Sequence, residues 1–210
     1  AQKLVRRIID LHREKPASRT VHDLRLLLKG QMDLVDIIIP RSARVSTNFG
    51  NQSMPAFIEE TGFRQVILNL VINARDAIER TGKIQISLQK VAKGQSIMKG
   101  AKGKKRFAPV DGAELSLTDN GKGIPGEIQE KLFDPFFTTK SSDTGSGFGL
   151  YNTRVFIEDH NGLIGFSSEV GKGTTFFLFL PLEIEEEENP VRHLKKTKRA
   201  TRAFIKTKKN

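Results

Sequence analysis

Three polar residues share one stripe of an amphipathic segment and present amide and carboxylate groups side by side. Asn69, Asn73 and Asp76 stand at positions i, i+4 and i+7, so a helix places them along one side. Asn is a poor helix former, because its side chain competes for the backbone. Two Asn residues one turn apart therefore indicate either a solvated helix edge or a polar site, and this segment alone leaves both interpretations open.

Four further motifs follow along the chain, and each combines polar or aromatic residues with small ones. In order, they are Asp119-Asn-Gly-Lys-Gly123, Leu132-Phe-Asp-Pro-Phe-Phe-Thr-Thr-Lys140, Gly145-Ser-Gly147-Phe-Gly149-Leu150 and Gly171-Lys-Gly173-Thr174. The third motif opens a helical pattern, so its backbone amides and the helix N-terminus could cradle phosphates. Its GxGxG spacing differs from the dinucleotide-binding GxGxxG, and no βαβ pattern surrounds it.

This ordered set resembles the N, G1, F, G2 and G3 boxes of the ATP-binding fold shared by sensor histidine kinases, gyrase-type topoisomerases, Hsp90 and MutL. The wording NLVINARDAI, DNGKGI, LFDPFFTTK and GFGLYNTR is most similar to the catalytic domain of a bacterial sensor histidine kinase. The resemblance covers roughly residues 20–182. Each box is weak alone, but five boxes in order at compatible spacing make a specific signal.

The first glycine motif has two interpretations. Asp119 ends an apolar run, and its carboxylate could either form an Asx-turn or accept a hydrogen bond from the exocyclic amine of adenine. The motif alone favours the turn, whereas its place among the five boxes favours adenine recognition. Thr174 resembles the family's G3 threonine, which supports adenine through its hydroxyl or a water. The resemblance adds Gly121, Gly123 and Ile124 to the adenine-binding group.

The resemblance also implies a phosphate and metal end of the site. Asn73 matches the family residue that binds Mg²⁺ through its amide oxygen, and a hard cation prefers oxygen ligands. Asp76 is a departure, because many sensor kinases have Lys at this offset, but we include it among the nucleotide-binding residues. The glycine-rich residues expected to hold the phosphates are Gly145, Gly147, Gly149 and Leu150.

Asn69 and Lys140 are the residues to which we assign catalysis. In gyrase, Hsp90 and MutL a Glu stands at the position of Asn69 and activates water, and Asn cannot serve as that base. Asn69 therefore favours phosphoryl transfer over hydrolysis. Lys140 begins a lid at residues 138–147 and could reach the γ-phosphate, or it is a solvated loop lysine. The lid is expected to be mobile without nucleotide, and Phe133, Phe136 and Phe137 are expected to anchor it.

The hydrophobic periodicity predicts the elements that position these residues. We expect an α/β (α+β) two-layer sandwich, in which a mixed, mostly antiparallel sheet of about five strands carries three helices on one face. The nucleotide would lie between the helices and the sheet. The predicted helices are 22–38, capped by Thr20, 59–80 and 147–160; the predicted strands are 41–49, 83–91, 113–119, 162–168 and 174–181. Residues 92–111 lack periodicity and are expected to form a long mobile loop.

The chain divides into three predicted parts. Residues 1–15 would be the end of a dimerisation-hairpin helix, residues 20–182 the ATP-binding catalytic domain, and residues 183–210 a charged, disordered tail. His22 superficially resembles a phosphoacceptor, because an acid follows it. Only 51 positions separate His22 from Asn73, however, which leaves no room for the family's helical hairpin. We therefore interpret His22 as an ordinary residue at the start of the first helix.

Composition bounds the class of protein. The chain has 210 residues, 37% of them hydrophobic, which suffices for one core with extensions. It contains no Cys, and no apolar run approaches the ~18 residues that span a bilayer, so we expect a cytoplasmic location, either free or as part of a larger sensor. The net charge of +11 is uneven, since residues 191–210 contribute nine Lys or Arg and no acid. No specific nucleic-acid partner is therefore expected.

The leading hypothesis is the catalytic domain of an ATP-dependent protein-histidine kinase in a two-component system. It would use Mg²⁺ and ATP, phosphorylate a His on its own dimerisation hairpin and work with a response regulator. Because that hairpin is missing here, the chain alone should show little activity. Two alternatives remain: a topoisomerase- or MutL-like ATPase, which Asn69 argues against, and a non-catalytic nucleotide-binding module, which the intact boxes argue against.

Overall fold

A central sheet and a layer of helices make up the computed structural model, which describes residues 18–78, 81–101, 105–140 and 147–183. Within these ranges the sheet has the strand order β2-β4-β7-β9-β8. Strands β2 and β4 are parallel, and the other neighbours are antiparallel. The strands are β2 Ala43–Asn48, β4 Gly82–Val91, β7 Gly112–Asp119, β8 Leu163–Glu169 and β9 Gly173–Pro181. The predicted mixed five-stranded sheet is confirmed.

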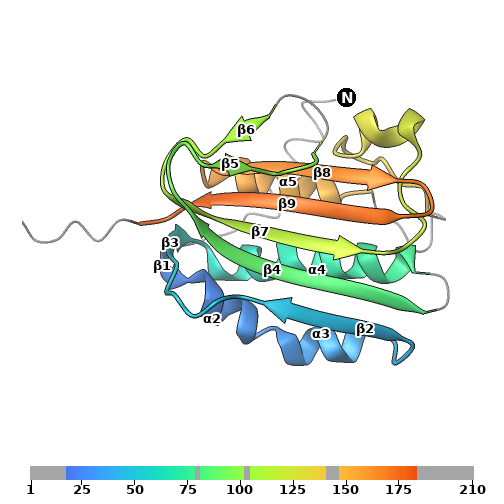
Figure 1. Ribbon diagram of the computed structural model, residues 1–210, viewed down its shortest axis with the longest axis horizontal. Coiled ribbons are helices and arrows are strands. Elements are labelled where there is room, and N and C mark those ends of the chain that lie inside the picture. The colour runs from blue at the N-terminus through green and yellow to red at the C-terminus, as the bar shows by residue number, and fades with distance from the viewer. Residues whose placement is uncertain (1–17, 79–80, 102–104, 141–146, 184–210) are drawn as a thin grey trace, which may run out of the picture.

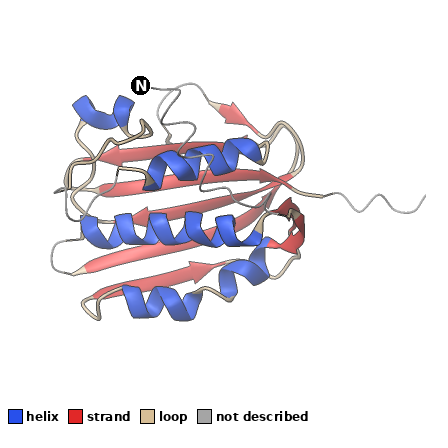
Figure 2. Cartoon of the chain, turned by 180° about the vertical axis from the view of Figure 1, so that it is seen from behind, coloured by secondary structure: helices blue, strands red, loops and turns tan. Residues whose placement is uncertain are grey.

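The longer helices all cover one face of this sheet, as Figures 1 and 2 show from the two sides. Helix α4 (Glu60–Ala77) crosses the middle, with α5 (Gly149–Asp159) on one side and α2 (Leu24–Lys29) and α3 (Met32–Ile38) on the other. The apolar face of α4 is buried as its periodicity predicts, and its buried residues are Phe63, Val66, Ile67, Leu70, Val71 and Ala74. In the described part of the chain, no helix is long and apolar enough to cross a bilayer.

The first predicted helix, residues 22–38, is wrong in its extent. The chain instead forms strand β1 (Thr20–Asp23), helix α2 (Leu24–Lys29) and helix α3 (Met32–Ile38). Asp23 is the N-cap of α2, because its side chain accepts a hydrogen bond from the backbone N–H of Arg25 over 2.9 Å. Gly30, a poor helix residue, ends α2. The apolar periodicity of residues 22–38 therefore continues across the break between α2 and α3 and does not predict that break.

Strand β1 exists because it has a partner. It pairs antiparallel with β3 (Pro55–Ile58), where His22 stands opposite Ala56. Thr20 is consequently the first residue of a strand and no helix cap, and His22 lies in a strand instead of at a helix start. The His22 ring lies 3.7 Å from the carboxylate of Glu60. This pairing joins two short segments far apart in sequence, which local propensity does not predict.

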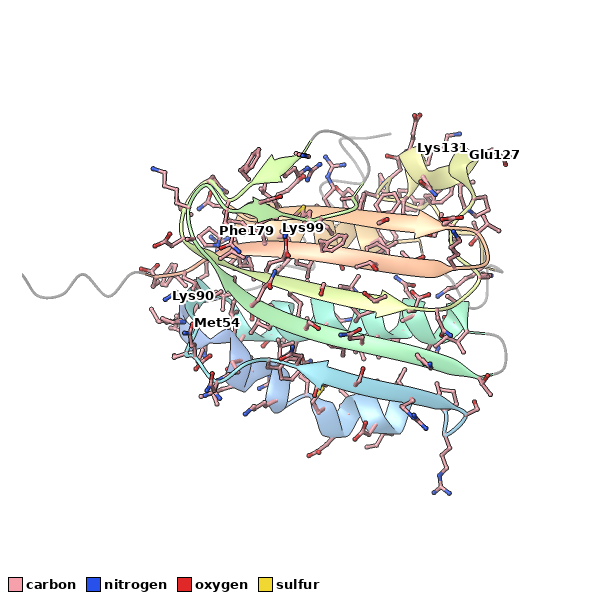
Figure 3. The ribbon with its side chains drawn as sticks, viewed as in Figure 1. Met54, Lys90, Lys99, Glu127, Lys131 and Phe179 are labelled. Carbon is pink, nitrogen blue, oxygen red and sulfur yellow. The ribbon has the colours of Figure 1, made fainter. Side chains whose placement is uncertain are left out.

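The predicted mobile loop at 92–111 is also wrong for the residues that the structure describes. Strands β5 (Ser96–Ile97) and β6 (Arg106–Phe107) form a hairpin on the sheet face opposite the helices (Figure 1). A second apolar cluster lies beneath it, made of Val91, Ile97, Met98, Ala108, Phe177 and Phe179. Figure 3 labels Phe179 and Lys99 on this face. Strand β9 therefore buries both of its faces, which explains its continuous apolar run FFLFLP.

One buried carboxylate fixes this hairpin to the sheet. Glu114 in β7 is 6% exposed, and its side chain accepts hydrogen bonds from the backbone N–H of Met98 over 2.5 Å and from the side-chain amide of Gln89 over 3.0 Å. A buried carboxylate needs such partners, because an unpaired one is costly. The β5 side of the hairpin is thus fixed to the sheet through Ile97 and Met98, whereas both residues of β6 are exposed.

His160 connects the end of α5 to the start of α4. Its Nδ1 lies 2.7 Å from the carbonyl oxygen of Phe156, and its Nε2 lies 3.2 Å from the backbone N–H of Glu59. The backbone N–H of Glu59 can only donate, so Nε2 accepts this hydrogen bond. The ring is therefore neutral, and its proton is on Nδ1, which donates to the carbonyl oxygen of Phe156. Burial, together with the charge of Arg19, lowers the pKa of His160 in spite of the hydrogen bond to Phe156 and the nearby carboxylates of Asp159 and Glu59, which raise it.

We predict that His160 makes the fold less stable as the pH falls below its ordinary pKa of 6.5. Because the folded-state pKa is the lower one, the unfolded chain takes up the proton first, and the free energy of unfolding decreases from that pH downwards. The measurement is urea unfolding at pH 7.5 and 5.5 for the parent and for His160→Gln, whose amide oxygen can still accept from Glu59. The variant should lose less stability between the two pH values; an equal loss would contradict the prediction.

Candidate nucleotide-binding site

An open cavity of about 1050 Å³ lies between α4, the loop after β7, the 3-10 helix η1 (Gly126–Lys131) and the start of α5. Figure 3 labels Glu127 and Lys131 on η1. This volume can accommodate a nucleotide. Eleven of the predicted site residues line the cavity: Asn69, Asn73, Asp76, Asp119, Gly123, Ile124, Lys140, Gly147, Gly149, Leu150 and Thr174. Gly145 lies outside the described residues, as do residues 141–146 of the predicted lid.

Asp119 ends β7 with its side chain buried at the cavity wall, only 3% exposed. Its Oδ1 accepts hydrogen bonds from the backbone N–H of Gly121 over 2.8 Å and of Thr174 over 3.3 Å. Within the described residues, Oδ2 accepts none. Burial raises the pKa of Asp119 in spite of these two bonds. The Asx-turn is therefore present, and the second carboxylate oxygen remains for a ligand, so the two interpretations of this motif are compatible.

Gly121 does not line the cavity, and its role in the structure is close packing. A Cβ at this position would lie 2.4 Å from the carbonyl oxygen of Ala77 at the end of α4. The next residue, Lys122, donates its backbone N–H to that same oxygen over 2.9 Å. Gly173 has φ +107, and a Cβ there would lie 2.0 Å from the carbonyl oxygen of Asp119. Two glycines thus bring two loops against α4 and Asp119.

The polar stripe of α4 faces the other part of the cavity. Asn69 Nδ2 donates to the carbonyl oxygen of Gly149 over 3.2 Å, and Asn69 Oδ1 accepts from the side-chain amide of Gln65 over 3.0 Å. Asn69 therefore ties α4 to the first turn of α5. This contact places the N-terminus of α5, where unpaired backbone N–H groups attract anions, beside the stripe.

Lys140 bridges the remaining two residues of the stripe. Its Nζ lies 3.3 Å from Oδ1 of Asn73 and 2.5 Å from Oδ2 of Asp76, whose Oδ1 is paired with Arg75. Burial acts to raise the pKa of Asp76, but the hydrogen bonds and charges of Lys140 and Arg75 outweigh it, and the pKa is lowered. The amide oxygen of Asn73 thus already contacts one cationic group, the ammonium of Lys140. A hard cation such as Mg²⁺ also prefers oxygen ligands, so this oxygen is suited to bind it.

The aromatic residues of the second motif pack around the start of the predicted lid. Phe133 contacts Phe166 edge to face at 5.9 Å between ring centroids, and Phe136 contacts Phe148 at 4.5 Å. Phe137 lines the cavity. Ser168 and Gln129 lie outside all five motifs, and no local sequence pattern distinguishes them. In the structure both bind the backbone of Ile124: Ser168 accepts from its N–H, and Gln129 donates to its carbonyl oxygen.

The fold and this cavity define an ATP-binding class of protein, and a family comparison agrees. The model of the family described as histidine kinase-, DNA gyrase B-, and HSP90-like ATPase matches residues 58–184. This match covers more than half of the chain, so the chain belongs to that family and carries its ATP-binding domain.

The curated relatives of this chain include sensor kinases. The sensor kinase CckA of Brucella abortus (strain 2308) is 35% identical over 188 residues, which cover 89% of this chain and 20% of the relative. The signal transduction histidine-protein kinase AtoS of Escherichia coli (strain K12) is 32% identical over 182 residues, which cover 86% of this chain and 27% of the relative. The chain thus spans less than a third of the length of either relative.

A solved structure has the same fold. The catalytic domain of histidine kinase ThkA matches with a TM-score of 0.60 at 27% identity, over 78% of this chain and 95% of that one. ThkA in complex with the response regulator protein TrrA matches with a TM-score of 0.63 at 26% identity, over 89% of this chain and 48% of that one. The predicted two-layer fold and the resemblance to this family are confirmed.

We predict that Asp119→Asn weakens ADP binding about ten- to a hundredfold, because a charged hydrogen bond is lost and a donor is left facing a donor. The Asn oxygen can still accept from Gly121, so the turn should persist. Isothermal titration calorimetry with Mg·ADP is the measurement. Asp111→Asn is the matched control, since Asp111 lies at the opposite end of β7 and accepts from Lys93. Unchanged affinity in Asp119→Asn would refute the adenine assignment.

Proposed function

We propose that this chain is the ATP-binding catalytic part of a sensor histidine kinase, which transfers the γ-phosphate of ATP to a histidine on a dimerisation hairpin. The observation that carries the proposal is the side chain at position 69. In the ATP-hydrolysing branches of the family a Glu stands there, whereas here Asn69 is held by Gln65 and Gly149 beside the cavity. An amide cannot take a proton from water. The naming of the relatives as sensor kinases supports the same conclusion.

In this proposal each part of the cavity has a separate task. Asp119 and Thr174 bind the adenine, with Gly123 and Ile124 beside the base. The amides at Gly147, Gly149 and Leu150 receive the phosphates at the start of α5. Asn73 holds Mg²⁺ through its amide oxygen, and the cation supplies charge neutralisation of the phosphates. Gly145 is assigned to the same phosphate group from its motif alone.

Lys140 and Asn69 act at the reacting end. The ammonium of Lys140 lies beside Asn73, within reach of phosphates bound there, and would stabilise negative charge on the transferring group. Asn69 orients groups through hydrogen bonds and leaves water unactivated. The transferred phosphoryl group passes to the imidazole nitrogen of a presented His, and the bond to the β-phosphate oxygen breaks, leaving ADP.

The proposed partners are a phosphoacceptor hairpin and a response regulator. The complex of ThkA with TrrA supports a response regulator as the acceptor of the phosphoryl group from the hairpin. The use of ATP implies a location in the cytoplasm. Residues 1–15 and 183–210, proposed as hairpin remnant and charged tail, lie almost wholly outside the described residues.

We predict that the chain alone releases phosphate from ATP very slowly, and that a dimerisation hairpin added in trans restores γ-phosphate consumption as phosphohistidine. A positioned general base typically contributes ~10²–10⁴-fold, so its lack should be plain in the rate. The measurement compares phosphate release by the parent with that by Asn69→Glu and Asn69→Ala, each with and without the hairpin.

Two outcomes would contradict this prediction. Brisk hydrolysis by the parent, dependent on Asn73 and unaffected by a hairpin, would move the protein to the ATPase branch. A phosphohistidine mapped to His22 by mass spectrometry would also refute it, because His22 lies in β1 beside Glu60. ADP binding without any phosphotransfer to the hairpin would instead favour the non-catalytic module.

A further inference from the structure

Three polar side chains stand in one row across strands β7, β9 and β8 at one end of the cavity. Asp119 pairs with Thr174, and Thr174 pairs in turn with Ser168. Residues directly opposite each other on neighbouring strands point to the same face of a sheet. Asp119 and Thr174 line the cavity, and Ser168 lies one strand farther from Asp119. The row Asp119, Thr174 and Ser168 therefore connects two residues of the cavity wall to Ser168, which does not line the cavity.

The hydroxyl of Ser168 has three partners but a single proton. The backbone N–H of Ile124 donates to its Oγ over 2.8 Å, the carbonyl oxygen of Gly173 lies 3.1 Å away, and Oγ1 of Thr174 lies 2.9 Å away. A hydroxyl offers one donor and two acceptor lone pairs. Since the carbonyl of Gly173 can only accept, all three bonds form in one way: Ser168 donates to Gly173 and accepts from Ile124 and Thr174.

This arrangement determines what Thr174 offers to a ligand. Its proton points to Ser168, so the lone pairs of Oγ1 remain for the cavity. The neighbouring Oδ2 of Asp119 is also an acceptor when the carboxylate is ionised. When position 6 of a purine faces these two acceptors, the amino group of adenine can donate to both of them, whereas guanine places a carbonyl oxygen, another acceptor, at the same position.

We propose that Ser168 is a positioning residue for base recognition: by taking the hydrogen bond of Thr174, it makes Thr174 an acceptor and favours adenine over guanine nucleotides. This inference rests on the proposed nucleotide site. Gln129 supports the same arrangement, because its amide donates to the carbonyl oxygens of Ile124 over 2.6 Å and of Ser168 over 3.4 Å. The loop that carries Ile124 is thereby held against Ser168.

The test compares Mg·ADP and Mg·GDP binding by isothermal titration calorimetry in Ser168→Ala. Loss of the serine frees the Thr174 proton to donate to the guanine carbonyl oxygen, so the preference for ADP over GDP should fall about three- to tenfold. Ser168→Thr, which keeps the hydroxyl, should retain the parental preference. Ser167→Ala is the matched control, because Ser167 is the preceding residue of β8 and faces the other side of the sheet.

A second background separates positioning from a general structural effect. In Thr174→Val no hydroxyl remains to be oriented, so adding Ser168→Ala should leave the ADP-to-GDP ratio unchanged. An unchanged ratio in the single Ser168→Ala variant, or the same fall in the Thr174→Val background, would overturn this inference while ADP binding by the parent upheld the nucleotide site. A parent chain that bound neither nucleotide would overturn both.

Discussion

The burial of one face of α4 against the sheet is the constraint on which the rest of the structure depends. Full burial of a residue such as Phe63, Ile67 or Leu70 contributes about 1.5–3 kcal/mol, and this contact fixes the rotation of the helix about its axis. Once that rotation is fixed, Asn69, Asn73 and Asp76 must face the cavity. The site therefore inherits its geometry from the core, and a polar stripe with poor helix propensity persists because apolar packing holds it in place.

Sequence periodicity predicted the elements whose burial repeats regularly. Helix α4 and strand β4 bury residues at their expected periods, and the ends of α4, β4 and β7 lie close to the predicted ones. Two features of the fold were not predicted, because contacts between distant parts of the chain determine them. The strand at Thr20–Asp23 forms through pairing with Pro55–Ile58, and the hairpin between β4 and β7 is held by Glu114 and a second apolar cluster. The unbroken apolar run of β9 was the available signal that both sheet faces are covered.

The same division applies to the site. Residues whose chemistry is unusual for their local setting, such as Asp119 before two glycines, can be recognised in the sequence. Ser168 does not, because a serine in a strand is ordinary and its importance comes from the register that sets it opposite Thr174. Gly121 shows a related limit: its motif is recognisable, but its contact with Ala77 at the end of α4 follows from the fold. Motifs thus identify the groups that line the cavity, whereas register and packing identify the residues that orient those groups.

Asp76 departs from the Lys common at its offset, and the structure gives this departure a physical sense. Asp76 pairs with Lys140, and both side chains are partly exposed, 28% and 31%. Ion pairs of this exposure are typically worth ~1 kcal/mol or less. The phosphates of a nucleotide bring more negative charge than one carboxylate, so they can compete for Lys140 at small cost. Asp76 therefore holds Lys140 at the edge of the cavity, beside Asn73, and in the proposed nucleotide site this ion pair would be weak enough for Lys140 to pair with a bound phosphate instead.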